Sequence, residues 1–416
     1  MKHFLISPLL FSALAMSCSQ LQSDPNGPSA LPSPADSSSG NPAKEFVLLP
    51  GAADGWRASL LLDNDPDGVW RMEPLQVFPQ YATPEVVGLD DQGSCWIMVS
   101  YSGKWTPTRL LHDQQWLGAI CQADVDADVF GNEIYVGGKK GVLYQVRSYA
   151  DGGVDARRIA SIPGREIHTL IAGDVDPRNP GAEVLVFTRP GGLYRLTPNQ
   201  VSNSNPSAVA AGDEWTVTHL TDLGGRIRDA RLLSDGRTMV TAARSGEISI
   251  LRIDRNGLKW SQIYSQDVGF GRLAVASDRL IYSSGDNGRV FRHQQQSDGS
   301  WQTTTIYSGP LGPRGLVCGQ FDPDANKETV AVFGYSGRVE LLTEANGEWT
   351  AQTLFTDRAR GHWLSVLEID GRNNTREILL SGYGARMVLL AANPGTGVEE
   401  AAVPSTDSDL HAALKP

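Results

Sequence analysis

The sequence predicts an all-β fold, a seven-bladed β-propeller with four-stranded antiparallel blades. Its 416 residues include 44 glycines and 24 prolines spread along the chain, which favours many short elements joined by turns. Strand-like runs recur at intervals of roughly 10 residues, with Gly or Asn-Gly turns between them. A tryptophan-led stretch recurs at intervals of 41 to 49 residues, apart from one of 110, and this is the length of a propeller blade.

The chain begins with a segment typical of an export signal. Lys2 and His3 precede an apolar run from Phe4 to Met16, and Cys18 follows it. The run has about 13 residues, fewer than the roughly 20 that a membrane-spanning helix requires. We therefore expect residues 1–17 to be removed as a signal peptide.

Residues 15–18, Ala-Met-Ser-Cys, resemble the lipobox of bacterial lipoproteins, in which a small residue precedes a cysteine that is lipidated. The family places leucine three residues before the cysteine, where this chain has Ala15. The resemblance implies an exported lipoprotein anchored in the outer membrane through Cys18, in the periplasm or at the cell surface. Ordinary signal cleavage is the alternative. Residues 18–44 are rich in Ser, Pro, Gly and Asp, and predict a disordered tether between membrane and domain.

The tryptophan-led stretches mark the outermost strand of each blade. They begin at Trp56, Trp105, Trp215, Trp260, Trp301 and Trp349. The long interval after Trp105 hides one more copy, in which Val154 takes the place of tryptophan, so the count is seven. Between these stretches come an apolar strand, an acidic turn, a second strand, a glycine turn and a third strand. This succession is clearest in residues 118–146, 169–196, 315–342 and 365–390.

The ends of the chain predict how the ring closes. After residues 387–390 the last blade has three strands, and no further outer strand follows. Residues 55–62 form an outer-type strand with no blade before it. We expect this N-terminal strand to complete the last blade, because closure removes an exposed sheet edge. The propeller then spans residues 45–394, and residues 395–416 form a disordered tail.

The acidic turns resemble those of bacterial β-propellers of the FG-GAP and VCBS-like type. Residues 173–177 with 181–184 (GDVDP, GAEV) and residues 124–126 with 131–134 (DVD, GNEI) carry the resemblance. The turn at 135–138 with the strand at 142–144 is also similar to quinoprotein-type repeats, including those of a lipoprotein scaffold for outer-membrane protein assembly. This second likeness does not extend to the acidic turn, which such repeats usually lack.

The FG-GAP resemblance raises calcium as a ligand. Asp124, Asp126 and Asp128 have the 1, 3, 5 spacing of a calcium loop, but Val129 stands where the loop needs glycine. The alternative is that these carboxylates accept hydrogen bonds from amides of their own turn. We expect no other cofactor.

Three cysteines follow Cys18. Cys95, Cys121 and Cys318 lie in apolar strand-like runs, and their number is odd. We expect buried free thiols that pack as small apolar side chains, and no disulfide framework.

One face of the predicted ring carries an excess of cations. The loops that lead into the inner strands share this face with the turns between second and third strands. Eleven lysines and arginines meet five carboxylates there, outside the acidic loop at 63–67. Such a rim concentrates anions, and guanidinium forks hold carboxylate, sulfate or phosphate.

The candidate ligand-binding residues on this face are Arg165, His168, Arg226, Arg228, Arg272, Arg314, Arg360 and His362, with Trp116 and Trp363 for stacking. The alternative is that several of these arginines pack against neighbouring blades or pair with carboxylates of the turns.

These observations favour a binding module or scaffold over an enzyme. The chain contains no Gly-x-Ser-x-Gly, His-Glu-x-x-His, Cys-x-x-Cys or Walker motif. Its net charge of −11 argues against nucleic acid as a partner. We expect a protein partner or an anionic glycan, and membrane contact only through the lipid anchor. The alternatives are a lyase or hydrolase of acidic polysaccharides, with His168 or His362 moving the proton, and an outer-membrane assembly scaffold, by analogy.

Overall fold

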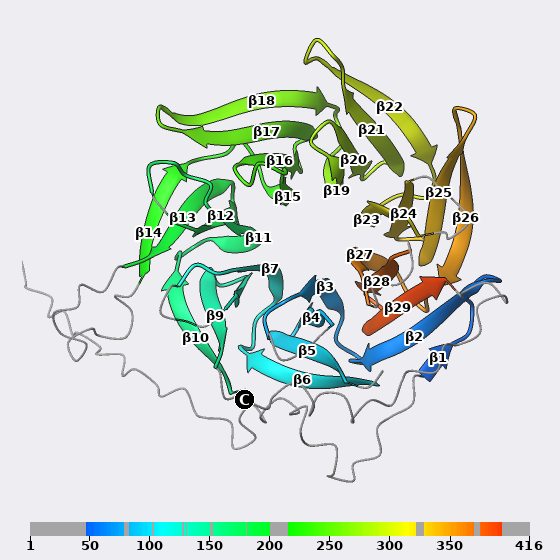
Figure 1. Cartoon of the computed structure of the whole chain (residues 1–416), viewed down its shortest axis with the longest axis horizontal. Coiled ribbons are helices and arrows are strands. Elements are labelled where there is room, and N and C mark those ends of the chain that lie inside the picture. Colours follow the sequence, from blue (N-terminus) through cyan, green and yellow to red (C-terminus); the bar gives the residue numbers. More distant parts are fainter. Residues whose placement is uncertain are drawn as a thin grey trace, which may run out of the picture.

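The structure, a computed structural model, describes residues 47–78, 83–101, 104–126, 129, 131–149, 153–179, 181–199, 215–321, 328–369 and 375–392. Within these residues, strands β1 to β29 form seven antiparallel sheets around a central axis (Figure 1). The predicted seven-bladed propeller is confirmed. The signal peptide, the tether, Cys18 and the C-terminal tail lie outside the described residues.

The strands of each blade follow in order from the axis outward. The first blade has β3 (Val69–Leu75), β4 (Glu85–Asp90), β5 (Ser94–Tyr101) and β6 (Lys104–His112). The second has β7 (Leu117–Ala123), β8 (Glu133–Gly138), β9 (Val142–Ser148) and β10 (Val154–Ser161). The third has β11 (Glu166–Gly173), β12 (Glu183–Arg189), β13 (Gly192–Pro198) and β14 (Trp215–Thr221). The fourth has β15 (Ile227–Leu232), β16 (Thr238–Ala243), β17 (Glu247–Asp254) and β18 (Gly257–Ser265).

The remaining three blades continue around the ring. The fifth has β19 (Phe270–Ser277), β20 (Leu280–Gly285), β21 (Arg289–Gln295) and β22 (Trp301–Ser308). The sixth has β23 (Pro313–Gly319), β24 (Thr329–Gly334), β25 (Arg338–Ala345) and β26 (Glu348–Thr356). The seventh has β27 (Gly361–Leu367), β28 (Glu377–Gly382), β29 (Arg386–Ala392), then β2 (Trp56–Asp63) and β1 (Val47–Leu49).

The two ends of the described chain close the ring. Strand β2 pairs antiparallel with β29, from Trp56 opposite Ala392 to Asp63 opposite Arg386. The N-terminal strand therefore completes the last blade, as predicted. Strand β1 pairs with the outer edge of β2 and adds a fifth strand to this blade, which the sequence analysis did not predict.

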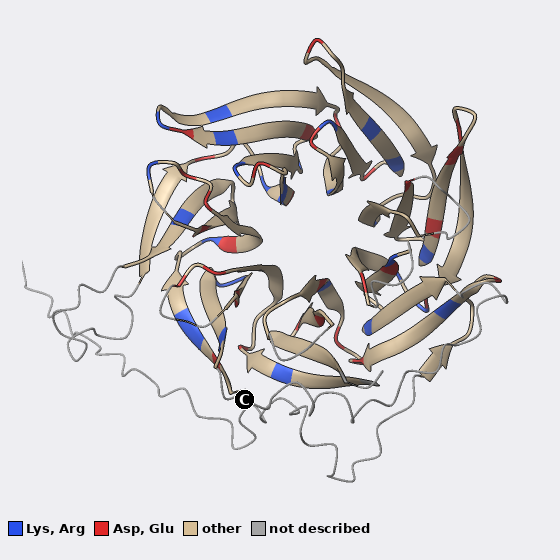
Figure 2. Ribbon diagram, viewed as in Figure 1, with Lys and Arg blue, Asp and Glu red and all other residues tan. Residues whose placement is uncertain are grey.

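Burial follows the position of a strand within its blade. The second strands β4, β8, β24 and β28 are buried at every residue, because they lie inside their own sheet and between two neighbouring blades. Outer strands are more exposed, and Lys and Arg bands lie on β6, β10 and β18 (Figure 2). The core lies between blades: one cluster joins Ile97 of the first blade to Ile134 of the second. Each blade therefore depends on its neighbours for stability.

The repeated tryptophans do not share one role. Trp215 and Trp349 pack edge-on against Tyr135 and Tyr282 of the preceding blade, with ring centroids 5.8 and 6.3 Å apart. Trp260 is instead 39% exposed. The repeat predicted the outer strands correctly, but the contacts of each ring depend on the neighbouring blade.

The cysteines and the helix content agree with a β-sheet core. Cys95 is buried, Cys121 and Cys318 are partly buried, and all three are free thiols whose pKa burial raises. Among the residues that the structure describes, no helix is long and apolar enough to cross a membrane.

Candidate functional site

Every inner strand has a β-bulge near its start, at its second residue in six strands and at its third in β11. The pairing of each inner strand with the second strand of its blade skips one residue, where two residues face one. The seven skipped residues are Trp70, Gly118, His168, Arg228, Gly271, Arg314 and His362. A bulge redirects side chains. Four predicted ligand-binding residues, two histidines and two arginines, occupy these positions around the axis.

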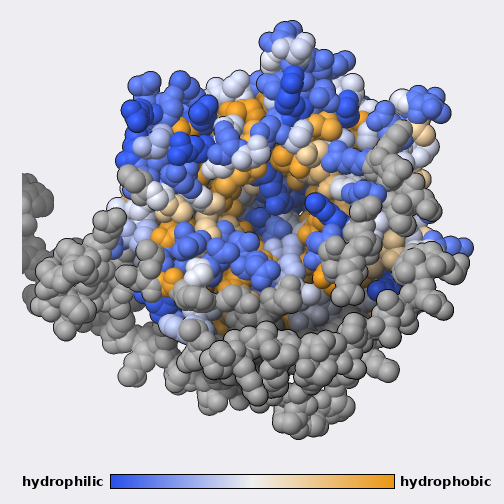
Figure 3. Space-filling model, in the orientation of Figure 1, coloured by the Kyte–Doolittle hydropathy of each residue, from blue (hydrophilic) through white to orange (hydrophobic). Residues whose placement is uncertain are grey.

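We call the face that carries the loops into the inner strands the rim face. The ring has a hollow at its centre, and the space-filling view of one of its two faces shows hydrophilic residues around it (Figure 3). Around Trp70, aromatic rings from the first, second and seventh blades contact one another. Its ring centroid lies 4.3 Å from His362, 5.0 Å from Tyr383 and 6.2 Å from Trp116.

Gly118 explains how the Trp116 indole can lie across β7. A Cβ at position 118 would be 2.0 Å from the Trp116 ring, so a side chain there would displace the indole. The same ring lies 5.1 Å from the ring of His168. The bulge glycine thus fixes one of the two tryptophans that we predicted for this face.

His168 is held between two charged side chains. Its Nε2 donates to Glu166 Oε1 at 2.5 Å, and its Nδ1 accepts from Arg226 Nη2 at 2.9 Å. The pKa of His168 is lowered to about 4, chiefly by burial and also by the Arg226 charge, while Glu166 opposes both. Both ring nitrogens are engaged, so a proton-transfer role for His168 requires these bonds to break first.

His362 is also a neutral imidazole. Its Nδ1 donates to the Trp70 carbonyl at 2.7 Å, which leaves Nε2 as the accepting nitrogen. Burial holds the pKa of His362 well below its usual value, and the nearby charges of Arg272 and Arg314 act in the same direction.

Several predicted anion-binding arginines are paired within the protein. Arg228 Nη1 lies 2.8 Å from Asp286 Oδ2, and Arg314 Nη2 lies 3.1 Å from Asp286 Oδ1. Arg165 donates to the Pro190 carbonyl at 2.9 Å and lies 3.8 Å from Asp222. For these residues the internal pairing that we gave as the alternative is present.

Trp363 and Arg272 lie below the surface. Trp363 is 2% exposed and Arg272 is 7% exposed, so this indole is not open for stacking on a ligand at the surface. The guanidinium carbon of Arg272 lies 4.3 Å from the Trp363 ring centroid, and that of Arg71 lies at the same distance. The tryptophan is therefore a platform for buried guanidinium groups.

The exposed members of the rim face include two tyrosines that the sequence analysis missed. Tyr335 is 39% and Tyr383 is 41% exposed, and their ring centroids are 6.5 Å apart. The exposed Arg360 lies 5.5 Å from the Tyr335 centroid, and Arg314 lies 5.4 Å from it. Leu311, 66% exposed, adjoins Tyr335, whose ring contacts the chain at residue 312. A signal was present, because both tyrosines follow glycine in the equivalent turn of adjacent blades.

We define the axial rim as Trp70, Trp116, Leu311, Arg314, Tyr335, Arg360, His362 and Tyr383. Beside it, between the fifth and sixth blades, a small shallow depression is lined by Pro310, Pro313 and Tyr335, among others.

The rim face is not cationic throughout. Asp90 at the end of β4, Asp91 in the turn to β5, and Asp222, before β15, lie on it beside the acidic loop at 63–67. The pKa of Asp91 is raised to about 6, chiefly by burial and also by the charges of Asp90 and Asp67. The five carboxylates counted from the sequence are therefore too few. Cations predominate in the sector formed by the fourth to seventh blades.

The opposite face explains the acidic turns. In four blades the glutamate that opens the second strand accepts a hydrogen bond from the amide eight residues earlier. These loop-closing bonds join Val77 to Glu85, Val125 to Glu133, Val175 to Glu183 and Ile369 to Glu377, at 2.9 to 3.2 Å. The glutamate of the FG-GAP-like turn therefore holds its own loop.

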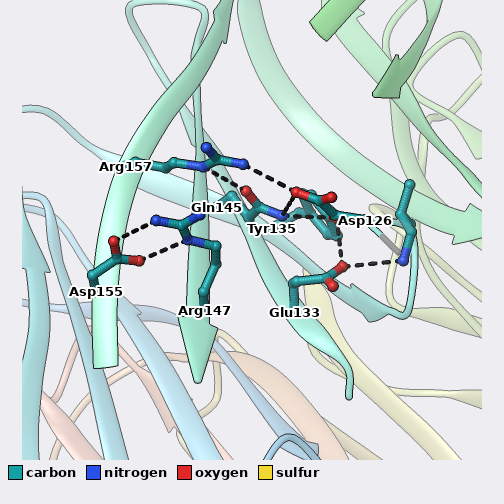
Figure 4. A network of polar contacts seen from close by, with 8 residues as sticks. Asp126, Glu133, Tyr135, Gln145, Arg147, Asp155 and Arg157 are labelled. Carbon is teal, nitrogen blue, oxygen red and sulfur yellow. Dashed lines mark hydrogen bonds and ion pairs between the residues drawn. The ribbon is translucent and has the colours of Figure 1, made fainter. Parts of the chain in front are cut away.

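Two of the three predicted calcium ligands, Asp124 and Asp126, lie among the described residues. Asp126 Oδ2 lies 3.0 Å from Arg157 Nη2 and accepts from Gln145 Nε2 at 3.4 Å, within a polar network that also contains Glu133 (Figure 4). Asp128 lies outside the described residues. No group of three or more potential metal ligands occurs in the part of the chain that the structure describes. Arg157 therefore supplies a positive charge beside Asp126.

Comparison with known proteins gives the fold and no family. No protein-family model matches the chain, and no curated protein matches it. Among solved structures it is similar to the WD40 β-propeller domain of Doa1, with a TM-score of 0.55 and 13% identity over 83% of this chain and 97% of that one. At this identity the likeness shows the propeller fold alone.

Proposed function

We propose that this chain is an exported, lipid-anchored propeller that binds an anionic ligand or protein partner on the axial rim. The supporting observation is the group of Arg314, Arg360, Tyr335 and Tyr383, in which exposed aromatic rings and guanidinium groups from adjacent blades lie within reach of one ligand. Guanidinium groups recognise carboxylate and phosphate geometry, and tyrosine rings contribute apolar area with a polar end.

Binding should depend on the exposed members of this group. Arrays of acidic peptides and of uronate-containing glycans provide the probes, and the affinity of the strongest probe is measured at low and high salt. We expect Arg360→Ala and Tyr383→Ala each to weaken binding about tenfold, since each removes a contact worth roughly 1.4 kcal/mol. Added salt should weaken binding to the wild type as well.

Arg237→Ala is the matched control. Arg237 is half-exposed on the opposite face, where it lies 2.8 Å from Asp174, so its loss should leave binding unchanged. If no probe binds, or if the two rim variants bind as tightly as the wild type, the axial rim is not the binding surface.

The proposed anchor rests on the lipobox-like residues 15–18 and the FG-GAP-like lipoprotein resemblance. We expect radiolabelled palmitate to enter the full chain expressed in a bacterial host, and to be absent from Cys18→Ala. Equal labelling of the two proteins would reject lipidation at Cys18, and the proposal would then be a secreted propeller without a lipid anchor.

A further inference from the structure

The axial channel is filled by charged side chains at the level of Trp363. Arg231 of the fourth blade lies 3.8 Å from Glu73 of the first blade, on the other side of the ring, so side chains from opposite blades meet on the axis. Arg71 and Arg272 stack on Trp363 between them. We call Arg71, Arg228, Arg231, Arg272, Arg314 and Trp363 the channel cluster.

Cations in this cluster outnumber the carboxylates that contact them. The ion pairs are Arg71 with Glu73 at 3.2 Å, Arg231 with Asp229 at 3.4 Å, and Arg228 and Arg314 with Asp286 at 2.8 and 3.1 Å. Two guanidinium groups therefore share one carboxylate at Asp286. Arg272 forms no ion pair with any residue that the structure describes, so the cluster carries an excess of two positive charges.

Arg272 is the member whose charge is least compensated. Its Nη1 donates only to the carbonyls of Gly271 and Arg228, at 2.9 and 3.4 Å. The pKa of Arg272 is lowered to about 9, chiefly by burial and also by the charges of Arg71, Arg314 and Arg228, although Asp229 opposes them. A buried guanidinium in this state is costly unless an anion accompanies it.

Three buried donors in the cluster also lack an acceptor. Arg231 Nε, Arg272 Nε and Trp363 Nε1 are all inaccessible to solvent and have no hydrogen-bond partner among the described residues, although Arg231 Nε lies 3.4 Å from Asp229 Oδ1. Buried N–H groups are almost always satisfied, so orphan donors on neighbouring side chains indicate a missing acceptor. The excess positive charge and the unpaired donors therefore both indicate a negatively charged group that accepts hydrogen bonds.

We propose that the channel cluster binds a divalent tetrahedral oxyanion, a phosphate or sulfate group, as a free ion or as an ester on a larger ligand. Two negative charges match the excess, and oxygens in several directions can accept from Arg272 Nε, Trp363 Nε1 and the guanidinium of Arg314. A carboxylate or chloride would compensate only one charge. The inference deepens the proposed function and rests on it, because Arg314 belongs to both the channel cluster and the axial rim.

Calorimetric titration of the mature protein with potassium phosphate, and separately with sodium sulfate, tests this site, with potassium chloride added to hold the ionic strength constant. We expect saturable binding of one ion per chain. Arg272→Met should weaken it at least tenfold, because it keeps an apolar chain on Trp363 and removes the guanidinium. Arg314→Gln is the second variant should Arg272→Met not fold, and it leaves the Arg228–Asp286 pair in place. Arg237→Ala is the control.

Phenyl phosphate and a sulfated monosaccharide distinguish the two sources of the group. Binding of the free ions supports a resident ion, and binding of the esters alone supports a larger ligand that also touches the axial rim. No binding by any probe, or equal affinity in the wild type, Arg272→Met and Arg314→Gln, overturns the proposal. The two proposals can also fail separately. If Arg360→Ala leaves phosphate binding unchanged and no peptide or glycan on the arrays binds, the channel site stands and the proposed function of the axial rim is rejected.

Discussion

A chain that starts at Asn64, and so lacks β1 and β2, is expected to lose the closed ring and to unfold or aggregate at temperatures that the full propeller withstands. Strand β2 pairs with the outer edge of β29 along its length and buries Ala58 and Leu61 in the core. Its loss removes about 5 kcal/mol of apolar burial and hydrogen bonding, an amount comparable with the total stability of many domains. It also leaves β29 as an open edge.

Thermal unfolding and size-exclusion chromatography measure this effect. A chain that starts at Glu45 keeps both strands and is the control, which should behave like the full protein. A synthetic peptide of residues 45–64, added to the shorter chain, should restore part of the lost stability by occupying the edge of β29. If the chain that starts at Asn64 unfolds at the same temperature as the control, the closure does not stabilise the ring.

Replacement of a loop-closing glutamate should have the second largest effect. Glu183 Oε1 accepts from the amides of Val175 and Asp176, at 2.9 and 2.5 Å, and the Glu183 side chain is fully buried. Glu183→Ala leaves both amides without their acceptor, which should lower the free energy of unfolding by about 3 kcal/mol. Urea denaturation at neutral pH measures this loss.

Glu183→Gln is the matched variant, because it keeps an acceptor oxygen in the same place. Burial raises the pKa of Glu183 to about 7 from the usual 4.5. The folded state therefore binds a proton more tightly than the unfolded state, so protonation adds stability that is fully present below pH 4.5 and is lost as the pH rises through about 7. Glutamine does not titrate, so the stability of the variant relative to wild type should increase between pH 5 and pH 8. A difference independent of pH would mean that Glu183 is ionised throughout this range.

The prediction from the sequence succeeded where the signal was local and repeated. Val154 could be placed on an outer strand because the copies on either side fixed its position in the repeat, although it lacks the tryptophan. The unpaired stretch at 55–62 predicted β2 by the same counting. Strand β1 has only three residues and no place in the repeat, so nothing in the pattern indicated it.

The contacts of the candidate site residues could not be predicted from the repeat pattern. The sequence gives no sign that His168 lies between Glu166 and Arg226, because Arg226 is 58 residues away and reaches it from the next blade. Trp363 resembled a surface tryptophan beside a loop, but its ring is covered by arginines of the first and fifth blades.

The sequence by itself determined the number of blades, the order of their strands and the strand that closes the ring, because each of these follows from residues near one another in a repeated pattern. The tertiary structure alone decided which arginines are paired inside the protein, which tyrosines are exposed and which charges meet on the axis. Those contacts join side chains from different blades, and their energies depend on burial and distance, which appear only when the ring is closed.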